Sequence, residues 1–241
     1  MKEDTNRSTE PINGGLLLPN GFSASVFVDS IKGKARELVV NDNGDVYVKL
    51  RYPDEEGGCA VLRDEDGDGQ ADEIQKFAIY PKTDRGGYQT AMRIHNGYLY
   101  FSTHLQVYRY KLTPGSMVPE SPMELVLDDD HEHGSHEHVA KPLTFDKEGN
   151  LYVPFGAPSN ACQSPKRTPE QPGLDPCPQL ADHAGVWKFP PNRTGMTQRD
   201  GERYATGIRS IVGMDWNHSD DELYVVMHGR DDLLRLWPKI Y

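Results

Sequence analysis

The stretch LTFDKEGNLYV, residues 143–153, decides the fold, because three further segments of the chain follow its pattern. Each copy begins with an apolar run and continues through a turn rich in Asp, Asn, Gly, His or Glu. A second run then opens with an aliphatic residue and a tyrosine. The other copies are residues 39–48, 92–101 and 214–225. Two short apolar runs around such a turn predict a β-hairpin, so the sequence predicts four hairpins.

The copies recur roughly every fifty residues, with about twenty additional residues before the fourth. This spacing leaves room for two more strands in each copy, which predicts one four-stranded antiparallel sheet per repeat. Radial repetition of such sheets is a β-propeller, in which ligands bind where the blades converge on the central channel. We therefore predict an all-β propeller with about four blades.

The composition narrows the classes of partner. The chain has 241 residues, with 26 basic against 37 acidic side chains and a formal charge of -11. Such an acidic balance argues against a nucleic acid or an anionic membrane, and no stretch is long and apolar enough to insert into a membrane. A small neutral ligand or a cation suits it better. We expect residues 1–14 to form a disordered polar tail and residues 15–241 to form one domain.

Two of the three cysteines lie in a Pro-rich insertion, residues 157–182, that has few large apolar residues. We predict a disulfide between Cys162 and Cys177, because this insertion needs a covalent link to hold a shape. A disulfide favours an oxidising compartment, periplasmic or extracellular, whereas two unpaired thiols would suit a cytosolic loop. The third cysteine, Cys59, opens a predicted strand and is expected to act as a small hydrophobic residue.

An acidic loop, DEDGDGQAD at residues 64–72, has the spacing of a calcium-binding loop. Hard cations take six to eight oxygen ligands, and the predicted ligands are Asp64, Asp66, Asp68 and Asp72. The loop is not an EF-hand, because Gln75 stands where that motif requires Glu. It lies between two predicted strands, so a bound ion would stiffen a hairpin. The alternative is a solvated acidic turn without a metal.

The run HEHGSHEH, residues 131–138, holds four of the nine histidines. A zinc site and a solvated loop are both compatible with it. His138 differs in its context, because it precedes the innermost strand of the third repeat, where a side chain can face the channel. A neutral imidazole there has the properties of a general base, although a structural loop histidine would have the same spacing.

The third and fourth repeats together resemble the soluble quinoprotein sugar dehydrogenases, which are six-bladed propellers that use pyrroloquinoline quinone. In that family a histidine precedes a strand of the form HxxxxLxF, and this sequence has HVAKPLTF at residues 138–145. The family's GLRN element corresponds to Gly207-Ile208-Arg209-Ser210, which departs from it at the last position. The family's cofactor-side loop corresponds to residues 227–232, where the glycine matches and the following proline does not.

The sorbosone dehydrogenase branch and the pyranose dehydrogenase domains are more similar still. The shared features are the acidic loop after a VLR strand, the NAC…PCP insertion, YATGIR and HGRD, and the resemblance covers about residues 15–241. Because six blades are expected and four repeats are present, we expect an incomplete propeller, with residues 21–29 as an outer strand awaiting a C-terminal blade. A genuine four-bladed unit, or one closed by a partner, is the alternative.

The resemblance implies oxidation of a sugar or sugar aldehyde by hydride transfer to the quinone, with an external electron acceptor such as a cytochrome. His138 would be the catalytic base, with activity falling below about pH 6. Arg209 would be a second catalytic residue, hydrogen-bonded to the quinone oxygen. A calcium ion would be held by the carbonyl groups of Gly229 and Arg230. The residues that would bind the cofactor are Arg209, Ser210, His228, Gly229, Arg230 and Asp231.

Two other classes of function remain open at this point. Calcium-dependent lactonases are also six-bladed propellers, but they bind their metal in the channel through side chains from several blades. A lactonase would hydrolyse lactones without a quinone. A non-catalytic propeller that binds a carbohydrate or a protein is the third reading, and failure to bind any quinone would favour it.

Overall fold

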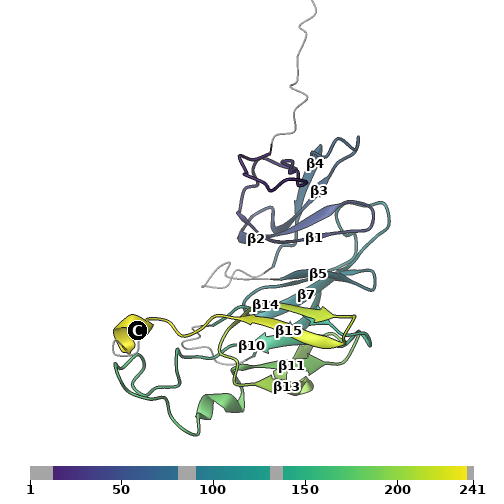
Figure 1. Ribbon diagram of the computed structural model, residues 1–241. Helices are drawn as coiled ribbons and strands as arrows, with labels where there is room; N and C mark the ends of the chain where they lie inside the picture. Colours follow the sequence, from purple (N-terminus) through teal and green to yellow (C-terminus); the bar gives the residue numbers. More distant parts are fainter. Residues whose placement is uncertain (1–12, 81–90, 131–137, 238–241) are drawn as a thin grey trace, which may run out of the picture.

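The computed structural model describes residues 13–80, 91–130 and 138–237, and in these ranges the chain is an all-β partial propeller (Figure 1). Two four-stranded sheets, one five-stranded sheet and one two-stranded sheet follow one another along the chain. The first sheet contains β1 (Ala35–Val40), β2 (Val46–Asp54), β3 (Gly57–Arg63) and β4 (Glu73–Phe77), paired in that order. The second contains β5 (Met92–His95), β6 (Tyr98–Ser102), β7 (Gln106–Lys111) and β8 (Glu124–Asp128).

The third sheet has the order β13-β11-β10-β9, from β9 (Thr144–Phe145), β10 (Leu151–Phe155), β11 (Gly185–Phe189) and β13 (Glu202–Thr206). The fourth is formed by β14 (Ile211–Asn217) and β15 (Glu222–Met227). A short strand, β12 (Met196–Thr197), leaves the third repeat and pairs in parallel with β8 of the second sheet. The helical turns are η1 (Pro178–Ala181), η2 (Gln198–Asp200) and α1 (Leu233–Leu236).

All four predicted hairpins are present, and they are β1–β2, β5–β6, β9–β10 and β14–β15. Their turns use the polar residues that the repeat supplies. In the third hairpin the Asp146 carboxylate accepts hydrogen bonds from Asn150 and from the Tyr152 hydroxyl. Burial raises the pKa of Asp146, but these hydrogen bonds outweigh it and leave that pKa below its usual value. The polar residues of this turn therefore have a direct structural role.

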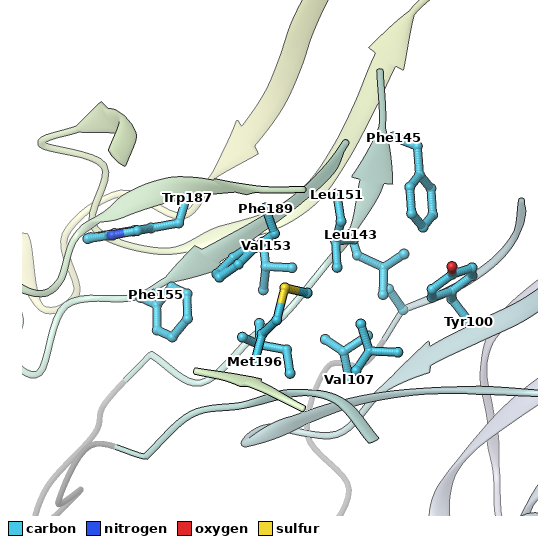
Figure 2. Close-up of a cluster of buried hydrophobic side chains, with 13 residues drawn as sticks. Tyr100, Val107, Leu143, Phe145, Leu151, Val153, Phe155, Trp187, Phe189 and Met196 are labelled. Atoms are coloured by element: carbon cyan, nitrogen blue, oxygen red, sulfur yellow. The ribbon is translucent and has the colours of Figure 1, made fainter. Parts of the chain in front are cut away.

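Apolar side chains from neighbouring sheets pack face to face and join the sheets into one stack. Tyr47 and Phe101 belong to a cluster between the first and second sheets. Figure 2 shows the cluster between the second and third, where Val107 and Leu127 meet residues of β10 and β11. All five residues of β10 are buried, because sheets cover both of its faces.

The fourth repeat differs from the others in its exposure. The tyrosines of the first three repeats, Tyr47, Tyr100 and Tyr152, are buried. Tyr224 is 53 % exposed, and the next three residues of β15 are exposed as well. Of β15, only Leu223 packs against an apolar cluster of the described residues, whereas the buried tyrosines each belong to such a cluster.

Residues 21–29, the expected outer strand, have no strand structure. They pack as irregular chain on the first sheet, where Phe27 and Val28 contact the cluster formed by Val48, Leu50 and Leu62. The Phe27 carbonyl accepts a hydrogen bond from the Ala71 amide at 2.8 Å. Side-chain burial on β2 and β3 therefore holds this segment without strand pairing.

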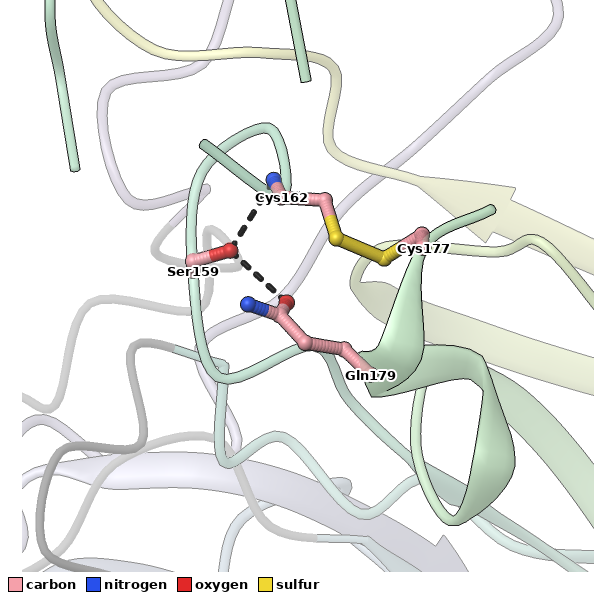
Figure 3. The surroundings of a disulfide bond; sticks show 4 residues. All are labelled: Ser159, Cys162, Cys177 and Gln179. Atoms are coloured by element: carbon pink, nitrogen blue, oxygen red, sulfur yellow. Dashed lines mark hydrogen bonds between the residues drawn. A yellow bond between two sulfur atoms is a disulfide. The ribbon is translucent and has the colours of Figure 1, made fainter. Parts of the chain in front are cut away.

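The predicted disulfide between Cys162 and Cys177 is present. The insertion around it is irregular apart from η1, and its chain is held by side-chain hydrogen bonds (Figure 3). The Ser159 hydroxyl accepts from the Cys162 amide at 3.0 Å and donates to the Gln179 side chain at 2.7 Å. Cys59 is fully buried, as predicted, and burial raises its pKa to about 12. None of the helices in the described ranges is long and apolar enough to cross a membrane.

Candidate functional site

The predicted quinone-site residues lie at one end of the sheets. Strands alternate in direction, so the hairpin turns of the four repeats gather at one end and the connections between sheets at the other. The second end, which we call the site end, carries His138 before β9, Arg209 before β14 and residues 228–232 after β15. It also carries residues 157–160 after β10, which we call the stem of the insertion. The predicted propeller topology therefore brings these segments to the same end.

His138 is held by the stem. Its Nδ1 atom lies 2.6 Å from the carbonyl oxygen of Ala157. Because a carbonyl oxygen only accepts, Nδ1 carries the proton of this hydrogen bond, and in the neutral ring the lone pair is on Nε2. Gly156 allows this approach, because a Cβ atom on it would lie 2.8 Å from the His138 Cβ. The arrangement suits a base that accepts a proton at Nε2.

A small cavity of about 10 Å³ lies beside His138, room for about one water molecule. It is also lined by His104, His183, Asp129 and Lys141. Lys141 and Asp129 are buried and form an ion pair with 2.5 Å between Nζ and Oδ2. Sequence reasoning missed this pair. The sequence offers one signal for it, because an acidic and a basic residue flank the histidine-rich run. That signal is weak, since charged residues flank many surface loops without forming an ion pair.

Arg209 is the centre of a second cluster, and its side chain is 11 % exposed. Its Nε donates to the Asn160 carbonyl at 3.0 Å, and Nη2 donates to the Asn160 side chain at 2.8 Å and to Asp231 at 2.7 Å. Nη1 donates to the carbonyl groups of Gly229 at 2.6 Å and His228 at 3.5 Å. All five N–H groups of the guanidinium are therefore directed at protein acceptors.

The other predicted cofactor residues take different positions around this cluster. Ser210 is buried, and its carbonyl accepts from the His228 amide at 2.9 Å. Arg230 is exposed. The Asp231 carboxylate also accepts a hydrogen bond from Nη2 of Arg167, in the insertion, at 3.1 Å. Burial raises the pKa of Asp231, but hydrogen bonds and charge from Arg167 and Arg209 outweigh it and leave that pKa below its usual value.

This arrangement does not fit a quinone oxygen on Arg209 or a calcium ion on Gly229. The guanidinium would first have to leave its present acceptors. The Gly229 oxygen already accepts from a cationic group, so an ion placed there would face a second positive charge 2.6 Å from the shared oxygen. The sequence resemblance identified Arg209 as a cofactor ligand but could not show what its guanidinium donates to. In the structure it donates to the Asn160 side chain. We derive no reaction step through the quinone.

The acidic loop lies between β3 and β4, at the opposite end of the sheets from His138. Carboxylate oxygens of Asp64, Asp66 and Asp72 lie within 4.8 Å of one another, close enough to share one cation. Asp68 is outside this group and accepts from the Gln70 amide at 2.8 Å. Backbone hydrogen bonds, from Gly69 first, lower the pKa of Asp64. Residues 131–137, the histidines of the zinc alternative, and residues 1–12 of the polar tail lie outside the described residues.

Comparison with known proteins gives no match at the level of sequence, because no family model and no curated protein matches the chain. Solved structures match its fold. The holo form of the PQQ domain of pyranose dehydrogenase from Coprinopsis cinerea aligns with a TM-score of 0.68 and 12% identity. That alignment covers 90% of this chain and 48% of the fungal one.

Two further structures have the same architecture. The calcium structure of a carbohydrate-active enzyme of family AA12 from Trichoderma reesei aligns with a TM-score of 0.62 and 17% identity, over 86% of this chain and 48% of that one. The PQQ-bound aldose sugar dehydrogenase from Streptomyces coelicolor aligns with a TM-score of 0.50 and 15% identity, over 84% and 58%. This chain thus spans about half the length of the structures it matches. At such identities the likeness establishes the fold alone, a partial β-propeller.

Proposed function

We propose that this chain forms part of a propeller oxidoreductase that oxidises a sugar or sugar aldehyde, with His138 as the base. The observation that carries the proposal is the hydrogen bond from His138 Nδ1 to the Ala157 carbonyl, which makes Nε2 the basic nitrogen of the neutral ring. The fold likeness to PQQ-containing sugar dehydrogenases supports the reaction class. A sorbosone-type or pyranose-type substrate is the finer proposal and rests on the sequence resemblance.

In this reaction the substrate C–OH group becomes C=O. Nε2 of His138 would take the hydroxyl proton, and a bound redox cofactor would supply the acceptor for the hydride that leaves the carbon. The imidazole must be neutral beforehand, so the rate falls as the pH falls through its pKa. Pyrroloquinoline quinone is the acceptor we propose, with calcium as its companion ion, because these occur in the matched structures. We assign neither of them a residue at the Arg209 cluster.

The proposal also covers the compartment of the protein and its external electron acceptor. The Cys162–Cys177 disulfide supports a periplasmic or extracellular location, because such bonds persist in oxidising compartments. An external electron acceptor such as a cytochrome would then remove electrons from the cofactor.

The test is turnover of the purified chain with pyrroloquinoline quinone, calcium and a dye acceptor, against a panel of aldoses and sorbosone. His138→Ala is expected to lower turnover by about 10²-fold or more, the usual contribution of a general base. His218→Ala is the matched control, because His218 is exposed in the hairpin turn between β14 and β15 at the opposite end. Wild-type turnover in His138→Ala, or no turnover by this chain with any substrate, would contradict the proposal.

A further inference from the structure

Arg209 joins three segments that lie far apart in the sequence. Its backbone carbonyl accepts from the Ala157 amide at 2.8 Å, and its side chain donates twice to Asn160, so one residue holds both ends of the stem. The same side chain reaches the carbonyl of Gly229 and the carboxylate of Asp231. A guanidinium with a rigid fork is suited to such a junction, because each N–H fixes a different acceptor.

Asn160 completes the junction from the other side. It is buried, 3 % exposed, and its Oδ1 accepts from Arg209 and also from the Asp231 amide at 2.9 Å. Its Nδ2 donates to the Asp231 carbonyl at 3.0 Å. Both polar atoms of the amide therefore have partners, and such a buried network favours one geometry.

We propose that Arg209 and Asn160 are positioning residues that fix the Ala157 carbonyl and, through it, the tautomer and orientation of His138. Ala157 connects the two halves of this arrangement, because its amide donates to Arg209 and its carbonyl accepts from His138. A stem free to move would no longer hold its carbonyl against Nδ1, and the proton would distribute between the two ring nitrogens.

The insertion supports the stem from its far end. Arg167 donates to Asp231 at 3.1 Å and to Asp232 at 2.7 Å. The insertion therefore contacts residues 228–232 through a side chain other than that of Arg209. Ser159, inside the stem, is fixed by the Cys162 amide next to the disulfide. The purpose that we infer for the insertion is therefore to brace the stem. This inference rests on the proposed function of His138 for its relevance to catalysis.

The experiment uses the ¹⁵N-labelled full chain without substrate or cofactor and follows two signals. The first is the pair of ring nitrogens of His138, assigned by comparison with His138→Gln. The second is hydrogen exchange at the amides of Ala157 and Asp231. The wild-type protein is expected to show the Nδ1–H tautomer across the pH range where the ring is neutral, and slow exchange at both amides.

Arg209→Lys keeps the charge and loses the fork, while Asn160→Ala removes both polar atoms. Both variants are expected to shift His138 toward a mixture of tautomers and to raise exchange at the two amides by about tenfold or more, the loss of a hydrogen bond to a charged group. Asn160→Asp keeps the acceptor for Arg209 and for the Asp231 amide but loses the donor to the Asp231 carbonyl, so it is expected to change the His138 signature less than Asn160→Ala does. Arg193→Lys is the control, since exposed Arg193 pairs with Asp200 alone among the described residues.

Wild-type ring signals and wild-type exchange in both Arg209→Lys and Asn160→Ala would overturn the inference. So would loss of the His138 signature in Asn160→Asp as complete as in Asn160→Ala, since the acceptor would then not be what matters. These readouts need no turnover. If His138→Ala keeps its activity while the ring signature still depends on Arg209, the proposed function fails and the positioning role stands.

Discussion

Gly156 packs directly against His138, and a methyl group on Gly156 would overlap the His138 carbonyl oxygen and lie 2.8 Å from its Cβ. Gly156→Ala must therefore push the histidine away from the stem. We expect the substitution to destabilise the chain by about 1–3 kcal/mol, as overpacking commonly does. We also expect it to lower turnover by about 10²-fold, because a displacement of about 1 Å at a catalytic group has that effect. Thermal unfolding and steady-state turnover measure the two quantities.

Gly213→Ala is the matched control for this variant. Gly213 lies in β14, and a Cβ atom there would meet Val226 side-chain atoms at 3.7 Å, an ordinary van der Waals contact. Equal losses of turnover in the two alanine variants would show that the effect of Gly156→Ala is general destabilisation.

Thiol counting checks the assignment of the three cysteines. The native chain is expected to have no rapidly reacting thiol, because Cys59 is buried and the other two are bonded. Unfolding without reductant should expose one thiol, and unfolding with reductant should expose all three. Replacing Cys162 and Cys177 together by Ser should lower the free energy of unfolding by about 3 kcal/mol by the chain-entropy relation. A reactive thiol in the native protein would contradict the burial of Cys59.

Asp45 gives the first hairpin a pH dependence. Its carboxylate is buried and accepts two hydrogen bonds from Arg63, each 2.7 Å long. The hydrogen bond from Arg63 lowers the pKa of Asp45 below its ordinary value of 3.8. A carboxyl group whose pKa is lower in the folded state stabilises the protein above the unfolded-state pKa, and this stabilisation is lost as the pH falls through the folded-state value.

Asp45→Asn is therefore expected to lower the free energy of unfolding by about 2 kcal/mol at neutral pH. The difference from wild type should shrink below about pH 4. Urea unfolding at a series of pH values measures it, and Asp42→Asn, in the same turn and exposed, is the control. A difference that stays constant down to pH 2 would contradict the ion-pair explanation.

In the acidic loop, Asp72 and Asp68 are expected to differ in their effect on calcium binding. If calcium binds there, it should raise the melting temperature of the wild-type chain, because ligands that bind the folded state stabilise it. Asp72→Asn should abolish the shift, since Asp72 belongs to the group of close oxygens. Asp68→Asn should retain most of it, because Asp68 lies outside that group. The melting temperature in calcium and in EDTA decides the matter, and no shift in the wild-type chain would exclude the site.

The sequence predicted those parts of the structure that depend on local patterns. The four hairpins follow from apolar runs around turns such as residues 146–150, where every contact lies within a few positions. The disulfide followed from two cysteines in one short insertion. Three of the four predicted loop ligands lie together for the same reason, while the backbone of Asp68 turns its carboxylate toward the Gln70 amide.

The sequence did not predict contacts made between loops. Asn160 and Asp231 are 71 positions apart, and no periodicity relates them. Lys141 and Asp129 are closer, but their pairing depends on how β8 and β9 bring both connections beside Phe155. The sequence resemblance singled out Arg209 as a cofactor residue, but the acceptors of its side chain depend on the path of the insertion.

The short parallel strand β12 has a consequence for how the protein comes apart. It belongs by sequence to the third repeat, yet Met196 pairs with Leu127 at the outer edge of the second sheet. A linear array of repeats can lose one unit at a time, because each unit contacts only its neighbours through side chains. Here β12 of the third repeat is hydrogen-bonded to β8 of the second sheet. Unfolding of the third repeat must therefore also remove the edge strand of the second sheet. The two repeats should therefore melt in a single cooperative transition.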